Sequence, residues 1–262
     1  MYYSICILVF AGAYLLNIVT ISVGYHRGLA HEAVRFHPRL RRGLVWAGNW
    51  ITGLDPKAWV VMHRLHHAHS DTARDPHSPV NVGILGIAME QLRSYERVLV
   101  GLMKQDSEIC KHAHDLDFEL SWLNRTGRWY LPYVLHGAIA LGLALAGLWL
   151  LGLAYFFGMM SHPVQGGLVN ALGHSVGGRN FETKDQSRNN LLVAWLVFGE
   201  GLQNNHHRYP RSAKFSYRRW EPDAGFGVCL LLETFGVLAI DYGHLIPGAP
   251  QHHERVEPAT SS

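Results

Sequence analysis

The chain has 262 residues, of which 16% are charged and 48% hydrophobic, and its formal net charge is +3. Soluble domains carry about 25% charged residues, so the composition indicates long uncharged segments, and the small net charge argues against a nucleic-acid partner. Cys6, Cys110 and Cys229 form no CxxC pair, which argues against a disulfide framework, an iron–sulfur cluster or a thiolate zinc site.

The N-terminal segment is uncharged, because the first charged residue is Arg27. Residues 2–24 are long enough for one membrane crossing, which needs about 20 apolar residues. A cleaved signal peptide is the alternative, but it would have a basic start, a shorter apolar core and a small-residue cleavage site. We therefore expect a retained span. The arginines that follow it place its end in the cytoplasm by the positive-inside tendency.

A second uncharged stretch runs from Trp129 to Gly178 and contains no Asp, Glu, Lys or Arg. As a helix it would extend about 75 Å, against a hydrocarbon core of about 30 Å, so it must cross the membrane twice. We expect spans at about residues 130–150 and 153–175, joined by a tight turn. Two weaker apolar segments, residues 43–61 and 223–241, are expected as helices at the membrane surface.

These elements predict an all-α integral membrane protein with about three, at most four, transmembrane helices and a cytoplasmic helical cap. Residues 1–246 form a single domain in this interpretation. Residues 247–262 are expected as a disordered tail, because they contain little apolar surface. The expected location is the inner (cytoplasmic) membrane of a bacterium.

Three histidine clusters lie close to the uncharged segments: His26-x4-His31, His63-x2-His66-His67 and Gln203-x2-His206-His207. Helix positions i, i+3 and i+4 share one face, so the second and third clusters can each direct ring nitrogens towards one place. Imidazole suits zinc, copper, iron and nickel. We interpret the clusters as a polynuclear metal centre, and the metal as iron that reacts with dioxygen.

A neutral histidine ligand needs a hydrogen-bond acceptor behind it to orient its ring. The sequence offers carboxylates close to the clusters, although their pairing with particular histidines cannot be derived from spacing. The candidates are Glu32, Asp71, Asp75 and Glu200.

The clusters resemble the three histidine boxes of the membrane fatty-acid desaturases, most of all the acyl-CoA Δ9 (stearoyl-CoA type) branch. The contexts Gly24-Tyr-His-Arg, Asp75-Pro-His77 and Gly199-Glu-Gly201 are similar to those of that branch. The segment from Leu168 to His174 resembles its additional ligand pair, an asparagine and a histidine one turn apart. The resemblance covers about residues 15–216.

The resemblance implies an enzyme with two iron ions (Fe2+) that uses O2 to insert a cis double bond, at Δ9, into a saturated fatty acyl chain. The implied metal contacts are His26, His31, His63, His66, His67, His174, His206, His207, Asn170 and Gln203. Gln203 departs from the family pattern, in which histidine usually begins the third box. One span precedes the first box, where the acyl-CoA branch typically has two.

Several partners follow from the same resemblance. The substrate would be an acyl-CoA, an acyl-ACP or a phospholipid, and Trp46, Trp50 and Trp59 are candidates for its tunnel wall, with helix packing as the alternative. Two electrons would come from a separate ferredoxin, cytochrome b5 or flavoprotein reductase. A basic run could dock an acidic donor, the phosphates of coenzyme A or anionic headgroups. This run consists of Arg208, Arg211, Lys214, Arg218 and Arg219.

Two other functions fit parts of the pattern. A membrane diiron hydroxylase of lipid or alkane-like substrates would have similar boxes, but Asn170 with His174 and the Asp75-Pro-His77 context favour desaturation. A metal-binding or transport protein would need ionisable residues within its spans. Apart from His174, the expected spans contain only His136 and His162.

Overall fold

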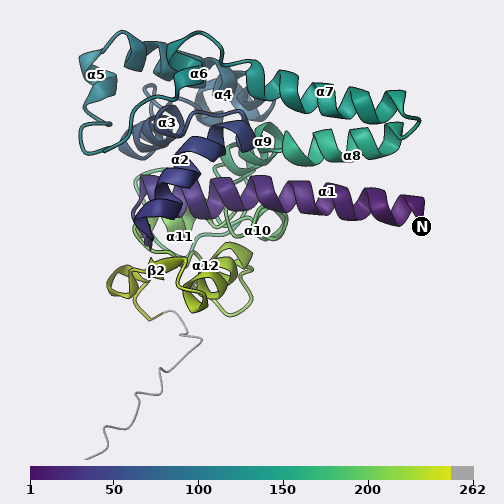
Figure 1. Cartoon of the computed structure of the whole chain (residues 1–262). Coiled ribbons are helices and arrows are strands. Elements are labelled where there is room, and N and C mark those ends of the chain that lie inside the picture. Colours follow the sequence, from purple (N-terminus) through teal and green to yellow (C-terminus); the bar gives the residue numbers. More distant parts are fainter. Residues whose placement is uncertain (249–262) are drawn as a thin grey trace, which may run out of the picture.

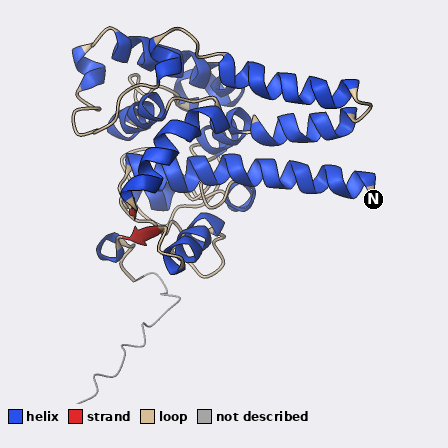
Figure 2. Ribbon diagram, in the orientation of Figure 1, coloured by secondary structure: helices blue, strands red, loops and turns tan. Residues whose placement is uncertain are grey.

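The computed structural model describes residues 1–248, which form a largely helical body with one small two-stranded sheet (Figures 1 and 2). The predominantly helical fold is as expected. Most of the expected tail, residues 249–262, lies outside the described residues. The elements are α1 Tyr2–Val19, η1 Thr20–Ala30, β1 Val34–Phe36, α2 Pro38–Thr52, α3 Pro56–His69, α4 Pro79–Met103, α5 Ser107–Cys110, α6 Trp122–Arg125, α7 Leu131–Leu145, α8 Trp149–Met159, α9 His162–Leu172, α10 Leu191–Leu196, α11 Gln203–Arg208, α12 Ala224–Thr234, β2 Leu238–Ile240 and η2 Tyr242–His244.

The first two elements form one continuous rod, in which the α-helix α1 passes into the π-helix η1. Within residues 1–248 this rod is the one helix that is long and apolar enough to cross a membrane. Its outer half exposes large side chains, with Ile7 68% and Leu8 70% exposed, whereas residues 22–30 are buried in the body. The rod therefore leads from an apolar surface directly to the first histidine cluster.

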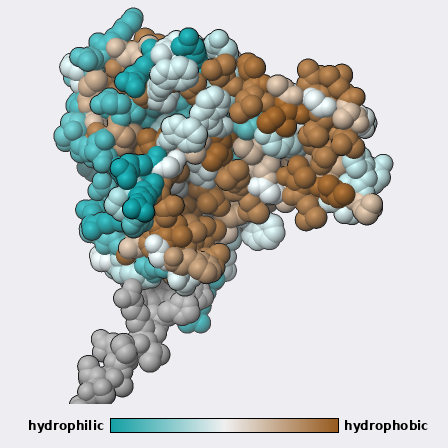
Figure 3. All heavy atoms as spheres, viewed as in Figure 1, coloured by the Kyte–Doolittle hydropathy of each residue, from teal (hydrophilic) through white to brown (hydrophobic). Residues whose placement is uncertain are grey.

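Helices α7 and α8 form a hairpin that packs against α1, and the three helices project together from the body (Figure 1). Glycine permits the close approach. A Cβ atom at Gly158 would lie 2.7 Å from Ala13 Cβ and 2.8 Å from the carbonyl oxygen of Phe10. Hydrophobic side chains cover the projecting helices, and hydrophilic ones gather at the other end of the molecule (Figure 3). This projection is the most apolar part of the surface in that view.

The long uncharged stretch contains three helices, whereas two long spans were expected at residues 130–150 and 153–175. Helix α7 has 15 residues and α8 and α9 have 11 each, fewer than the about 20 of a full crossing. The hairpin turn comes at residues 146–148, where Gly147 has a φ of 80°. The second break, at Met160 and Ser161, precedes Pro163, which has no backbone N–H to bond the carbonyl of Met159 and so cannot continue the hydrogen-bond ladder of α8.

Residues 43–61, expected as one surface helix, belong to α2 and α3. Gly53 ends α2 with a φ of 75°, a conformation that glycine adopts without steric cost. Asp55 then begins α3, because its Oδ1 accepts hydrogen bonds from the amides of Lys57 and Ala58, and Pro56 occupies the first turn. This break directs α3 into the body, where it carries the second histidine cluster.

Residues 223–241, also expected as one helix, form α12 followed by strand β2. The strand pairs antiparallel with β1, with Val34 opposite Ile240. Both residues belong to a buried apolar cluster with Val23 of η1 and Phe226 of α12. The small sheet therefore packs behind the π-helix and helps to hold it in place.

The contact between α1 and α8 predicts the effect of a larger side chain at Gly158. Gly158→Val should destabilise the protein by about 1–3 kcal/mol, because the new atoms would meet backbone and cannot be accommodated by a rotamer change. The measurement is the unfolding temperature in detergent. Gly137→Val is the matched control, since a Cβ atom at Gly137 of α7 has nothing within 4 Å. Equal unfolding temperatures for the two variants would contradict the tight packing.

Candidate metal centre

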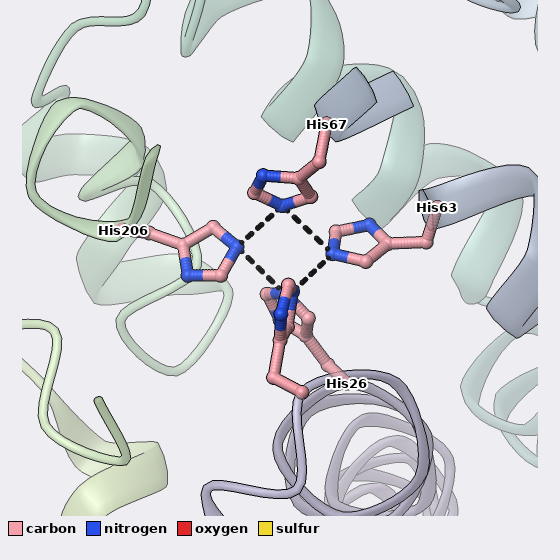
Figure 4. Close-up of side chains that lie close together, drawn as sticks. His26, His63, His67 and His206 are labelled. Carbon is pink, nitrogen blue, oxygen red and sulfur yellow. Dashed lines mark hydrogen bonds between the residues drawn. The ribbon is translucent and has the colours of Figure 1, made fainter. Parts of the chain in front are cut away.

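Five histidines from four segments converge in the body. His26 lies in η1, His31 follows it, His63 and His67 lie one turn apart on α3, and His206 lies on α11. One ring nitrogen from each can be chosen so that all five lie within 4.8 Å of one another. Figure 4 shows four of these rings meeting from opposite sides. Residues distant in the sequence thus form one nitrogen-rich group, called the five-histidine group below.

The spacing of the nitrogens fits metal ligation. The Nε2 atom of His206 lies 2.9 Å from the Nε2 atoms of both His26 and His67, and the Nε2 atom of His63 lies 3.0 Å from that of His67 and 2.7 Å from that of His31. Two nitrogens that bind one ion at right angles, each at about 2.1 Å, would be about 3.0 Å apart. The four contacts are close to this separation.

Four of these five imidazoles are neutral at neutral pH. Burial, reinforced by neighbouring histidines, lowers the pKa of His31, His63, His67 and His206 well below the ordinary value. A neutral ring has a nitrogen lone pair, which a protonated ring lacks. The group can therefore offer lone pairs to a cation without first losing protons.

A second group contains His66, His174 and His207, and lies beside the first. Its ring centroids are 4.8–5.0 Å apart, and the ring of His207 is 4.5 Å from that of His67. The Nε2 atoms of all three are buried and have no hydrogen-bond partner. Three converging buried nitrogens without partners fit a bound metal ion, since unpaired buried polar atoms are otherwise rare. We call this set the three-histidine group.

A carboxylate holds the other ring nitrogen of each member of the three-histidine group. His66 Nδ1 lies 3.0 Å from both carboxylate oxygens of Asp75, His174 Nδ1 2.9 Å from Asp71 Oδ2, and His207 Nδ1 2.7 Å from Asp185 Oδ2. An Nδ1–H donor to a carboxylate leaves the lone pair on Nε2. Each carboxylate therefore fixes both the tautomer and the direction of its histidine.

The electrostatics of these carboxylates support the donor assignment. Burial alone would raise the pKa of Asp75 and Asp185, but the hydrogen bond and charge interaction with His66 and His207, respectively, lower it overall. The pKa of Asp71 is lowered in the same way through His174. All three are ionised near neutral pH, and an ionised carboxylate is the stronger hydrogen-bond acceptor.

The five-histidine group has a comparable support through Glu200. Its Oε2 lies 2.5 Å from His26 Nδ1, and its Oε1 accepts a 2.7 Å hydrogen bond from Arg27 Nη1. Arg27 is fully buried and also donates to Asp223 Oδ1 at 3.0 Å, and its guanidinium lies 3.7 Å from the centroid of Phe215. A paired, buried arginine thus fixes the carboxylate that orients His26.

A cavity of about 110 Å³ adjoins both histidine groups. Its wall includes His26, His63 and His66, and also Asn170 and Gln203. The Gln203 side chain donates from Nε2 to the carbonyl oxygen of Glu200 at 2.7 Å. Asn170 and Gln203 therefore share the cavity wall with members of both histidine groups.

The three candidate tryptophans are separated by the structure. Trp59 lines the cavity and stacks on His63, with ring centroids 5.1 Å apart. Trp46 is 73% exposed, and Trp50 accepts a hydrogen bond from His136 through its carbonyl oxygen. Neither of these two lines the cavity. Their expected role in a substrate tunnel is therefore not supported, whereas the position of Trp59 fits it.

Sequence reasoning missed two residues of the site. Asp185 is 22 residues from His207 and in no cluster, so no spacing rule could identify it. His77, which the expected ligand set leaves out, stacks on His66 and is buried with an unpartnered Nδ1. Burial lowers the pKa of His77 to about 3. Conversely, Glu32 is exposed, and the structure pairs it with no histidine.

Comparison with known proteins agrees with this geometry. Residues 6–224 match the family model described as fatty acid desaturase. The chain is 32% identical to the hex-5-enoyl-[acyl-carrier protein] acetylenase of Moorena producens (strain JHB), over 87% of this chain and 74% of the relative. It is 31% identical to the sn-1 stearoyl-lipid 9-desaturase of Anabaena variabilis, over 83% of this chain and 76% of the relative. It is also 31% identical to the Delta-9 acyl-lipid desaturase 1 of Arabidopsis thaliana, over 83% of this chain and 68% of the relative.

The family match covers both histidine groups, the cavity and the helices that position them. It confirms the family that the histidine boxes indicated. The chain is an oxidoreductase that belongs to the fatty acid desaturase family.

Proposed function

We propose that this protein inserts a cis double bond, at Δ9, into a saturated fatty acyl chain. The observation that carries the proposal is the position of the two histidine groups at one wall of a mainly apolar cavity. The reaction would take two hydrogens from neighbouring methylenes. With O2, two electrons and two protons, it would yield the alkene and two waters.

The ten metal contacts expected from the sequence are part of the proposal. The five-histidine group would hold one iron ion and the three-histidine group a second, with Asn170 and Gln203 on the cavity side of the second. Bound iron would supply the activation of dioxygen that removal of hydrogen from unactivated methylenes requires. The protein would supply ligand direction through Asp71, Asp75 and Glu200, as expected, and through Asp185.

The cavity wall would bind and orient the acyl chain. Side chains from α1, η1, α3, α4 and α9 contribute, among them Ile18, Ile21, Met62 and Leu92. Apolar contact with these residues removes water from the chain and from the reacting carbons. The carrier is proposed as coenzyme A, acyl carrier protein or a phospholipid, because the names of the relatives cover all three kinds.

We also place the protein in the inner membrane of a bacterium, with α1, α7 and α8 in the bilayer and the histidine groups on the cytoplasmic side. The hydrophobic surface of the projecting helices supports this placement (Figure 3). Arg35, Arg39 and Arg42 are exposed beyond the first helix and fit the positive-inside tendency. Arg27 does not count towards it, because it is buried with Glu200 and Asp223.

An external ferredoxin, cytochrome b5 or flavoprotein reductase would donate the electrons. Of the basic run after the third box, Arg211 is half exposed and Arg218 makes a hydrogen bond to Asn180, whereas Lys214 is buried. An acidic donor could therefore be attracted by the arginines of the run. Lys214 is not available to it.

Loss of a ligand from the three-histidine group tests the proposal. We expect His66→Ala and His207→Ala to abolish formation of monounsaturated fatty acids in an expressing host, while the protein stays in the membrane fraction. Mass spectrometry of host lipids is the measurement, and His114→Ala, an exposed histidine outside both groups, is the control. Hydroxylated products from the unaltered protein would instead indicate a diiron hydroxylase, and full activity of His66→Ala would refute the site.

Asp185 tests the role of the supporting carboxylates. Asp185→Asn should lower metal affinity about 10- to 100-fold, because the amide is a weaker acceptor for His207 Nδ1–H. The measurement is iron content of the purified protein by elemental analysis across a chelator series. Asp117→Asn is the matched control, since Asp117 is exposed and pairs with Arg41. Unchanged iron retention in Asp185→Asn would contradict the assignment.

Gln203 tests whether the departure from the usual third box affects ligation. Gln203→Ala should reduce product less than His66→Ala does, because the side chain hydrogen-bonds to the Glu200 carbonyl and supplements the histidine ligands. Product yield and iron content are measured together for both variants. An equal loss of both quantities would show that Gln203 binds iron directly.

A further inference from the structure

One face of α9 forms part of the cavity wall. Six residues of α9 line the cavity, and all of them except Pro163 follow the i, i+3, i+4, i+7, i+8 pattern of a single helix face; these five are His162, Gln165, Gly166, Val169 and Asn170. Asn170 lies at the end near the histidine groups. His162 and Gln165 lie towards the other end, about two turns and about one and a half turns from Asn170. A wall meant only for methylene groups would not need polar side chains there.

The amide orientation of Gln165 is determined by its neighbours. The Ser161 hydroxyl donates its only proton to the carbonyl oxygen of Gly158, at 2.7 Å. It must therefore accept from Gln165 Nε2, which lies 2.7 Å away. This leaves Gln165 Oε1 as a buried acceptor that has no donor in the structure.

His162 presents a second unpaired atom on the same face. Its side chain is 8% exposed, and its Nδ1 is buried without a hydrogen-bond partner. A saturated chain in the cavity would leave both His162 Nδ1 and Gln165 Oε1 unpaired. Buried polar groups without partners are costly, most of all where bilayer replaces water. The two unpaired atoms, His162 Nδ1 and Gln165 Oε1, therefore indicate a ligand that places a polar atom beside them.

We propose that His162 and Gln165 form a subsite for an alcohol group carried on the acyl substrate, an inference that rests on the proposed desaturase function. The alcohol would donate its proton to Gln165 Oε1 and accept a hydrogen bond from His162 Nδ1–H. A carbonyl or ether oxygen cannot satisfy Gln165 Oε1, because it has no proton to donate. At 1.5 Å per residue, Gln165 lies about 8 Å and His162 about 12 Å along α9 from Asn170.

Two kinds of substrate carry such an alcohol. One is an acyl chain hydroxylated at its methyl end, and the other is a lipid whose glycerol keeps a free hydroxyl. Both present the same hydrogen-bonding group on an apolar chain. Because the subsite is remote from the histidine groups, either kind of substrate could place its hydroxyl there, and matched probes distinguish the two.

The test measures binding, so that it does not depend on catalysis. Trp59 lines the cavity, and its fluorescence reports occupancy of the purified full-length protein in detergent; Trp59→Phe identifies its share of the signal. The probes are saturated fatty acids of several chain lengths, their ω-hydroxy counterparts, and monoacylglycerols with and without methylated hydroxyls. We expect one hydroxylated probe to bind about tenfold more tightly than its matched plain probe, as one satisfied buried hydrogen-bonding pair implies.

Variants of the subsite should remove this preference. Gln165→Met and His162→Phe should each bind plain and hydroxylated probes within about twofold, because they remove one partner but keep the wall filled. Val164→Leu on the outer face of the same helix, 67% exposed, should keep the preference. Equal binding of plain and hydroxylated probes by the unaltered protein would overturn the subsite and indicate that water pairs with these atoms. That result would not affect the desaturase proposal, which the lipid analysis tests separately. A preference for hydroxylated probes in a protein that forms no unsaturated product would refute the desaturase proposal and leave the subsite standing.

Discussion

The hydrogen bond between a buried carboxylate and a histidine Nδ1–H is the interaction on which the centre depends. It occurs four times, from Glu200, Asp75, Asp71 and Asp185, and each time it leaves the Nε2 lone pair directed inward. Without these acceptors an imidazole could rotate or exchange tautomers, and its metal-binding nitrogen would lose direction. Burial also favours the neutral form of several of the crowded histidines; it lowers the pKa of His207 to about 4, and those of His31 and His63 well below the ordinary value.

The buried carboxylates create a second requirement, because a buried negative charge needs a positively charged partner. Arg27 provides it for Glu200 and Asp223 together, through its two terminal nitrogens. This explains why a fully buried arginine lies inside η1. His26 and Arg27 are consecutive in that π-helix, yet His26 Nε2 faces His206 whereas the Arg27 guanidinium faces Glu200 and Asp223. Irregular winding is common where a helix must serve a functional site.

The sequence was sufficient to predict what depends on local spacing. His63, His66 and His67 on one helix, and the third cluster after Gln203, follow from helical periodicity, and the family follows from their order. Contacts between remote segments could not be derived, so Asp185 was missed, and the sequence could not distinguish Trp59, which lines the cavity, from Trp46, which does not. Helix ends were also misjudged. Hydropathy cannot detect the break at Met160 and Ser161, because apolar residues continue on both sides of it, and only Pro163 indicates it.

That break has a consequence for substrate selection. Because α9 is a separate helix, its axis need not continue that of α8. One face of α9 can therefore line the cavity from His162 to Asn170. The same helix ends at Leu172, two residues before His174 of the three-histidine group. A rigid element therefore fixes the distance between the polar end of the cavity and the histidine nitrogens that we propose as metal ligands. An acyl chain bound by its polar group at His162 and Gln165 would present one particular carbon to the histidines. The position of the double bond in the acyl chain would then follow from the length of α9.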